Sequence, residues 1–127
     1  MTSGHGPPQG HDEAVRRVLL ADRAGTQARA VALGRDLGGI IDATADSNSD
    51  DEHDPEGSTI AFERAQVLAL LDGASARLAE IDEALGRLDD GSYGRCAACA
   101  GPIAPARLAA RPSATLCIAC ASRPRGR

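Results

Sequence analysis

Four cysteines form the pattern with the clearest chemistry in this 127-residue chain. They come as two pairs, Cys96-x2-Cys99 and Cys117-x2-Cys120, with 17 residues between the pairs. Two residues between cysteines let both sulfurs face one ion, and two such pairs supply the four thiolates that a structural Zn²⁺ site needs. The spacing therefore predicts one structural zinc ion per chain, with every coordination position filled by protein.

A pair of redox-active CxxC motifs is the alternative interpretation of the cysteines. Such motifs normally accompany a βαβ pattern, which the surrounding sequence lacks, so the zinc site is favoured. Zinc-bound thiolates can still be oxidised in either case. The sequence contains no Ser/His/Asp set, no phosphate-binding loop and no zinc site with a free position. We therefore expect a protein that is not an enzyme.

The segment from 91 to 127 is predicted to form the zinc finger and a short basic tail. Three prolines between the cysteine pairs exclude a continuous helix there. Ile103 and Leu108 are expected to pack over the metal as a minimal core, and the metal is expected to supply much of the folding free energy.

The segment before the cysteines has the pattern of a coiled-coil helix. Apolar residues alternate at spacings of four and three over about three heptads. These residues are Val67, Leu71, Ala74, Leu78, Ile81, Leu85 and Leu88. Asp54 is a good N-cap, and Pro55 suits the first helical position, where its missing N–H costs nothing. The helix is therefore predicted to run from Pro55 to Asp89 or Asp90.

An earlier helix is predicted from residue 12 to about residue 37, after a Gly-, Pro- and His-rich segment at 1–11 that we expect to be disordered. The Gly38–Gly39 pair can end this helix, or Ile40–Ile41 can continue it for another turn. Its rough apolar stripe consists of Val15, Val18, Leu19, Ala24, Ala28, Val31, Leu33 and Leu37.

The narrow apolar seam of the second helix requires a partner helix. The first helix is the nearest candidate, so we expect a long antiparallel helical hairpin, a coiled coil, over residues 12–90. A homodimeric coil through the second helix is the alternative. Aromatic residues make up 2% of the chain, which argues against a thick globular core. The predicted fold class is therefore all-α, a helical hairpin followed by a small C4 zinc-finger module.

The stretch from 42 to 57, at the turn of this hairpin, is strongly acidic. It holds seven acidic residues and no basic residue. The spacing of its carboxylates does not fit a Ca²⁺-binding loop, which needs Gly at the sixth position and Glu at the twelfth. Two interpretations remain: a solvated turn in which Asp54 is only an N-cap, or an anionic tip that contacts basic groups or Mg²⁺ in a partner.

The C-terminal segment has the opposite charge, with six arginines and no acidic residue from Gly91 onward. These arginines could contact phosphate. However, no aromatic residue beyond Tyr93 interleaves with them, and no helix has a clear base-reading face. We therefore expect no direct sequence-specific DNA binding.

The sequence from 91 to 120, "GSYGRCAACAGPIAPARLAARPSATLCIAC", resembles the C4 zinc finger of the DksA/TraR family. The preceding heptad helix and the acidic stretch resemble the coiled-coil hairpin and tip of that family. The resemblance implies a regulator that binds bacterial RNA polymerase through the secondary channel, where the tip acts near the active site and modulates initiation. The best-known members act with the alarmone ppGpp in the stringent response, so ppGpp at the polymerase interface is a further candidate partner.

The tip motif of the family is Asp-x-x-Asp-x-Ala. Asp51 and Asp54 match its two aspartates, and Glu56 stands at the alanine position. The resemblance thus implies Asp51, Asp54 and Glu56 as the partner-binding tip. A second departure is Ala100, where many members have Gly. The alternative function is a zinc-stabilised adaptor or redox-sensing protein without polymerase activity.

The ends of the chain bear on where the protein acts. The N-terminus lacks a basic region followed by an apolar stretch, and no apolar run reaches the ~18 residues of a membrane span. We therefore expect a cytoplasmic bacterial protein that does not associate with membranes.

Overall fold

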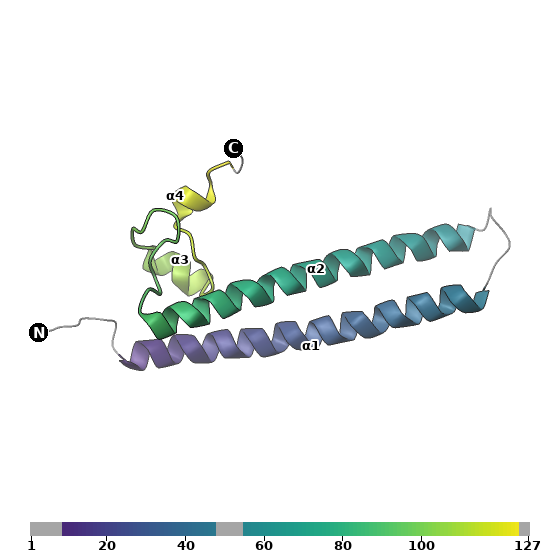
Figure 1. Ribbon diagram of the computed structural model, residues 1–127, viewed down its shortest axis with the longest axis horizontal. Helices are drawn as coiled ribbons and strands as arrows, with labels where there is room; N and C mark the ends of the chain where they lie inside the picture. Colours follow the sequence, from purple (N-terminus) through teal and green to yellow (C-terminus); the bar gives the residue numbers. More distant parts are fainter. Residues whose placement is uncertain (1–8, 48–54, 125–127) are drawn as a thin grey trace, which may run out of the picture. The chain divides into compact units, whose positions relative to one another are not determined.

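The computed structural model describes residues 9–47 and 55–124. These residues form two long helices and two short ones (Figure 1). They are α1 (Gln9–Ser47), α2 (Pro55–Asp90), α3 (Pro105–Ala110) and α4 (Ile118–Ala121). An isolated bridge joins Arg95 and Pro102, and the described part of the chain contains no strand. The predicted all-α fold, a helical hairpin followed by a cysteine cluster, is confirmed.

The bounds of α2 agree with the sequence prediction, but α1 is longer at both ends. It begins at Gln9, so residues 9–11, expected to be disordered, are helical. Asp12 then falls in the first turn, where a carboxylate stabilises the helix dipole. At the other end α1 passes through Gly38–Gly39 to Ser47, and the half-buried Ile40 lines a groove together with Ile60 of α2. Residues 42–47 of the acidic stretch are therefore helical, and 48–54 lie outside the described residues.

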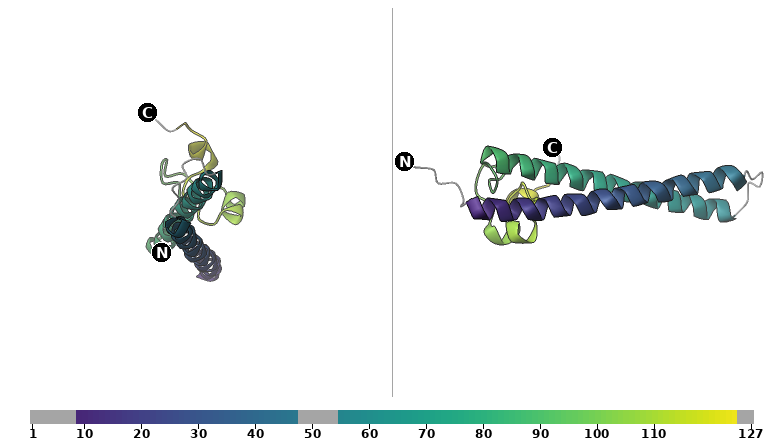
Figure 2. Two further views of the ribbon diagram at one scale, coloured as in Figure 1. Left: turned by 90° about the vertical axis from the view of Figure 1, so that its right-hand side faces the viewer. Right: turned by 90° about the horizontal axis from the view of Figure 1, so that it is seen from below.

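The contacts divide the chain into two units, which we call the base unit (residues 1–23 and 79–127) and the middle unit (residues 24–78). In each unit, α1 and α2 lie side by side (Figure 2). The core of the base unit is a cluster of fully or nearly buried side chains from both helices. Its members are Leu19, Ile81, Ala84 and Leu88, with Val15, Leu85 and Tyr93 packed against them.

Two ion pairs join α1 to α2 at the surface of the base unit. Arg16 Nη2 lies 2.9 Å from Asp89 Oδ1, and Arg23 Nε lies 2.6 Å from Asp82 Oδ1. The hydrogen bond from the Arg23 guanidinium holds the pKa of the Asp82 carboxyl below its usual value. Exposed pairs of this kind contribute little free energy, so their main effect is on the register of the two helices.

The seam of α1 differs from the apolar stripe predicted for it. Val18 and Val31 are each 52% exposed, and Ala24 and Ala28 also face solvent. Apart from Asp12, Arg16 and Arg23, which are half-buried beside the seam, the positions of α1 that are at least partly buried follow spacings of 4, 3, 4, 4, 3, 4 and 3. They are Val15, Leu19, Asp22, Thr26, Ala30, Leu33, Leu37 and Ile40. The predicted stripe was therefore right at Val15, Leu19, Leu33 and Leu37 and wrong at its other four positions. The seam also includes polar residues at 22 and 26, which a search for apolar residues passes over.

The seam of α2 agrees with the predicted heptads, since all seven predicted positions are buried or half-buried. Within residues 9–47 and 55–124, no helix combines the length and the apolar character needed to cross a membrane.

Candidate metal centre

The end of α2 directs the chain into the first cysteine pair. Gly91 has φ +84°, a left-handed conformation that commonly follows the last helical turn. The backbone N–H groups of Ser92 and Tyr93 both donate to the Arg87 carbonyl, at 2.9 and 3.1 Å. Asp90 Oδ1 accepts hydrogen bonds from the N–H and the hydroxyl of Ser92, which lowers the pKa of the Asp90 carboxyl. These bonds fix where the metal-binding loop begins.

The first cysteine pair lies in a tight hydrogen-bonded turn. The Cys96 N–H donates to the Gly101 carbonyl at 2.7 Å, and the Ala100 N–H donates to the Cys96 carbonyl at 2.9 Å. Two further N–H groups point at sulfur: Ala98 N lies 3.4 Å from Cys96 Sγ, and Gly101 N lies 3.4 Å from Cys99 Sγ. Such bonds stabilise the thiolate form that a metal requires.

Ala100 occupies an unusual backbone conformation in this turn. Its φ is +65°, and it is the only non-glycine residue with positive φ in the described part of the chain. An L-residue with a Cβ atom pays a steric cost in this region, whereas glycine does not. Ala100, where many members of the family that the sequence resembles have glycine, is therefore a position whose backbone conformation favours glycine.

The second cysteine pair lies at the start of α4. Cys117 is the N-cap residue, and Cys120 is in the single turn that follows. The Ala121 N–H donates to the Cys117 carbonyl at 2.8 Å and closes that turn. The Ala97 N–H donates to the Thr115 carbonyl at 2.7 Å, which ties the first turn to the segment that leads to the second cysteine pair. The two cysteine pairs are thereby held face to face.

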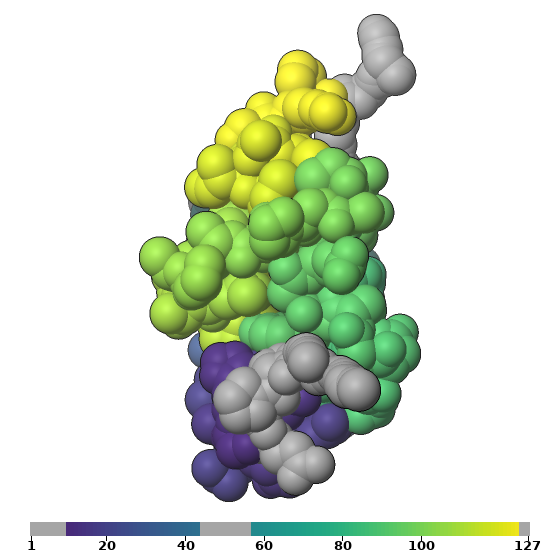
Figure 3. All heavy atoms as spheres, turned by 90° about the vertical axis from the view of Figure 1, so that its left-hand side faces the viewer, coloured from purple at the N-terminus to yellow at the C-terminus, as the bar shows by residue number. Residues whose placement is uncertain are grey.

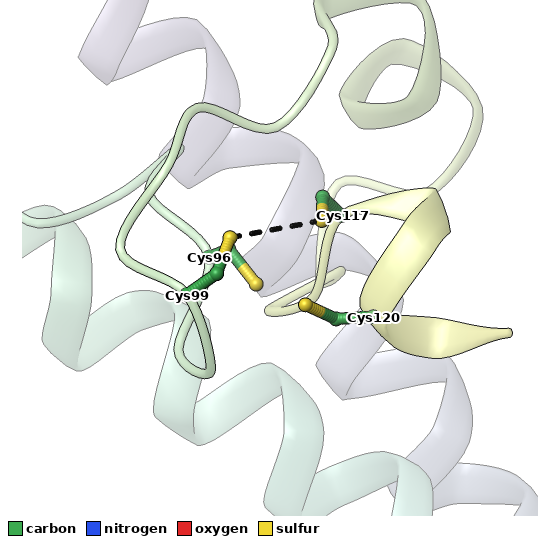
Figure 4. A group of neighbouring side chains, drawn as sticks. All are labelled: Cys96, Cys99, Cys117 and Cys120. Atoms are coloured by element: carbon green, nitrogen blue, oxygen red, sulfur yellow. Dashed lines mark hydrogen bonds between the residues drawn. The ribbon is translucent and has the colours of Figure 1, made fainter. Parts of the chain in front are cut away.

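The four sulfur atoms converge (Figure 4). All four lie within 4.8 Å of one another, and Cys99 Sγ is 4.0 Å from Cys117 Sγ. Tetrahedral zinc with Zn–S bonds of about 2.3 Å requires sulfurs roughly 3.8 Å apart, so the set fits the ion with small adjustments. Cys96 is buried and Cys99 is exposed. The four cysteines hold one structural zinc ion, as their spacing predicted.

The protonation of the cluster follows from its hydrogen bonds. Backbone N–H groups of Cys117 and Cys99 lower the pKa of the Cys96 thiol to about 6. The neighbouring sulfurs, Cys117 first, accept from the Cys120 thiol and raise its pKa to about 12. Without metal, the cluster at neutral pH thus contains the Cys96 thiolate and the protonated Cys120 thiol. Zinc binding must release the proton of Cys120.

The residues between the two pairs form a small core, only part of which was predicted. Ile103 is buried as expected, and Leu108 is half-buried. Ser113 and Ala114 are also buried, at 2% and 6% exposure, although neither has a signal that distinguishes it from other small residues of the sequence.

Two side-chain hydrogen bonds hold this segment in place. The Tyr93 hydroxyl donates to the Pro112 carbonyl at 2.7 Å, and burial raises the pKa of that tyrosine. Arg107 Nε donates to the Leu116 carbonyl at 2.8 Å, next to the second cysteine pair. Tyr93 and Arg107 are therefore both engaged in the fold of the finger.

The finger packs against the helices of the base unit (Figure 3). The first turns of α1, the loop residue Tyr93 and residues of α3 line an apolar groove of ≈ 590 Å³, which Val18 and Leu108 face from the two helices. Arg111 Nη2 lies 3.5 Å from Glu80 Oε1 of α2.

The predicted tip residues cannot be placed in the same way. Asp51 and Asp54 lie outside the described residues. Glu56 is the second residue of α2, and its side chain lies outside them as well. The assignment of these three residues to a partner-binding tip stays a prediction.

A helical hairpin followed by a C4 zinc finger defines a distinct class of small zinc proteins, and comparison with known proteins identifies it. Residues 91–124 match the family described as prokaryotic dksA/traR C4-type zinc finger. The structure of transcription factor DksA2 from Pseudomonas aeruginosa is similar over 91% of this chain and 83% of that chain, with 33% identity and a TM-score of 0.73. This chain belongs to the DksA/TraR family.

Two curated relatives carry the name RNA polymerase-binding transcription factor DksA. They come from two strains of Caulobacter vibrioides, NA1000 / CB15N and ATCC 19089 / CIP 103742 / CB 15. Each is 45% identical to this chain over 56 residues. The aligned part covers 44% of this chain and 39% of the length of each relative.

Proposed function

We propose that this protein is a transcription regulator that binds bacterial RNA polymerase in the cytoplasm. The observation that carries the proposal is the match to DksA2, because it covers the hairpin and the finger together at 33% identity. The names of the Caulobacter relatives support the same partner. The four cysteine ligands would fill a tetrahedral zinc site and leave no position for a substrate, which supports a structural role for the ion.

The hairpin enters the secondary channel of the polymerase in this proposal, and the acidic stretch acts near the active site to modulate initiation. The charge distribution supports this division of roles. Residues 42–57 carry seven acidic side chains, whereas the segment from Gly91 onward carries only basic ones. An acidic tip is suited to basic groups or Mg²⁺, and its effect should weaken as salt rises. ppGpp is a candidate co-regulator, with no residue of this chain assigned to it.

In vitro transcription with the cognate polymerase tests this proposal. The reactions use a ribosomal and an amino-acid promoter, with and without ppGpp. We expect Asp51→Asn and Asp54→Asn to weaken the effect on transcription while helicity and melting stay nearly unchanged, because Asn caps a helix about as well as Asp. If both variants act on transcription like the wild type, the acidic tip has no role. Pull-down of core polymerase at low salt is the binding control.

Glu56→Ala restores the alanine of the family motif and is the matched gain-of-function variant. We expect it to strengthen the effect of the wild-type protein on the same promoters. An unchanged effect would show that the residue at this position does not limit activity.

The exposed position of Cys99 favours a second candidate, a zinc-stabilised adaptor or redox sensor that has no polymerase activity. Exposed zinc thiolates are accessible to oxidants. This candidate predicts that oxidation releases zinc and that no complex with core polymerase forms at low salt. A stable polymerase complex would decide against it.

A further inference from the structure

The middle unit contains an unusual number of glycines inside its helices. Within residues 24–78, six glycines are helical: Gly25, Gly34, Gly38, Gly39, Gly57 and Gly73. An added Cβ atom at Gly25, Gly34, Gly38, Gly39 or Gly73 would meet nothing within 4 Å. None of these glycines is therefore needed for a close approach of two helices. Each glycine lowers the equilibrium constant for forming the helix about fourfold relative to an alanine at the same position.

The apolar core of the middle unit is also thin. Among the side chains described there (24–43 and 57–78), only Thr26 and Ala74 are buried, and both are small. The base unit, by contrast, buries Leu19, Ile81 and Leu88. Buried large side chains are the main source of helix–helix stability, so the two units differ in what holds α1 to α2.

The seam of α2 loses one apolar layer in the middle unit. Ile60 and Val67 are one heptad apart, and the seam position between them would be residue 63 or 64. These residues are Glu63 and Arg64, and both are exposed. A groove of ≈ 620 Å³ lies at this level, and its lining includes Gly39 of α1. The missing layer and the helical glycines thus occur in the same part of the hairpin.

We propose that the middle unit opens as a local unit while the base unit stays folded. Few buried apolar contacts and weak intrinsic helices are the properties of segments that unfold locally below the free energy of global unfolding. The acidic stretch belongs to residues 24–78, so on the proposed function a partner that binds the closed form more tightly than the open form is sensitive to this opening. The closed fraction then scales the apparent affinity of that partner, and the partner in turn closes the hairpin.

Hydrogen exchange of the full-length, zinc-loaded protein tests the proposal directly. We expect amides at 27–40 and 62–76 to exchange at similar rates, at least about tenfold faster than amides at 81–88. Equal rates in both units would mean that the hairpin opens as a whole, and would overturn the proposal. A rate that rises steadily from residue 76 toward residue 62 would indicate fraying from the turn, and would overturn it as well.

Glycine-to-alanine variants provide a matched comparison. The combination Gly34→Ala, Gly38→Ala and Gly39→Ala should slow exchange at 27–40 and 62–76 roughly 60-fold, at about fourfold for each substitution. Gly86→Ala is the control, because this glycine is also helical and also has open space at its Cβ position, but belongs to the base unit. It should leave exchange in the middle unit unchanged. If Gly86→Ala slows the middle unit, or the triple variant does not, the local opening is refuted.

Discussion

Replacing Ala100 with glycine should stabilise the zinc finger. The φ of +65° places the Cβ atom of Ala100 close to its own carbonyl oxygen, which costs about 1–2 kcal/mol relative to glycine. Glycine also gives the unfolded chain more freedom, which offsets about 0.4–1 kcal/mol of this gain. The Ala100 side chain is exposed, so removing its methyl group sacrifices no packing. The net expectation is a stabilisation of about 0.5–1 kcal/mol.

Urea and thermal unfolding at a fixed excess of zinc measure this change. A gain of that size should raise the melting temperature by about 2–4 °C for a chain of this length. Ala97→Gly is the matched control, since Ala97 is an exposed alanine in the same turn without positive φ. At position 97 glycine only adds freedom to the unfolded chain and relieves no strain, so we expect the free energy of unfolding to fall by about 0.4–1 kcal/mol. If Ala100→Gly is as destabilising as Ala97→Gly, the argument from backbone strain is wrong.

A third variant tests the neighbouring glycine. A methyl group on Gly101 would lie 3.3 Å from Cys99 Sγ, which is tighter than an ordinary contact. A sulfur bound to zinc cannot move away freely, so Gly101→Ala should lower both stability and zinc affinity. Unchanged zinc affinity in chelator competition would show that the turn can relax around the added methyl group.

Two further predictions concern the same module. Tyr93→Phe removes the hydroxyl that donates to the Pro112 carbonyl. We therefore expect the free energy of unfolding of the zinc-loaded protein, measured in urea, to fall by about 1–2 kcal/mol. An unchanged free energy of unfolding would mean that water replaces the bond. Zinc affinity should rise at least about tenfold per pH unit between pH 7 and 8. The reason is that Cys120, with a pKa of about 12, must release its proton to bind the ion. Cys96, with a pKa of about 6, is already a thiolate in this range and adds nothing to the slope. Chelator competition at the two pH values measures this slope, and a flat profile would contradict the assigned protonation states.

Local spacing was sufficient to predict much of this protein. The heptads of α2 and its start at Pro55 follow from short-range rules of periodicity and helix capping, and the structure agrees with both. The zinc ligands also follow from spacing, because two residues between cysteines dictate a turn that brings both sulfurs together.

Other features depend on which surfaces meet in space. The seam of α1 includes Thr26 because α2 lies opposite it, and a polar residue gives no periodic signal of burial. Tyr93 and Arg107 donate to carbonyls 19 and nine residues away, which no local rule connects. The left-handed conformation of Ala100 belongs to a turn that the hydrogen bonds of Cys96 with Ala100 and Gly101 close. Short-range preferences thus determined the long helices and the set of zinc ligands. Only the folded chain decided the seam of α1, the hydrogen bonds that support the finger and the unequal cores of the two units. The reason is that burial is a property of two facing surfaces and not of one segment.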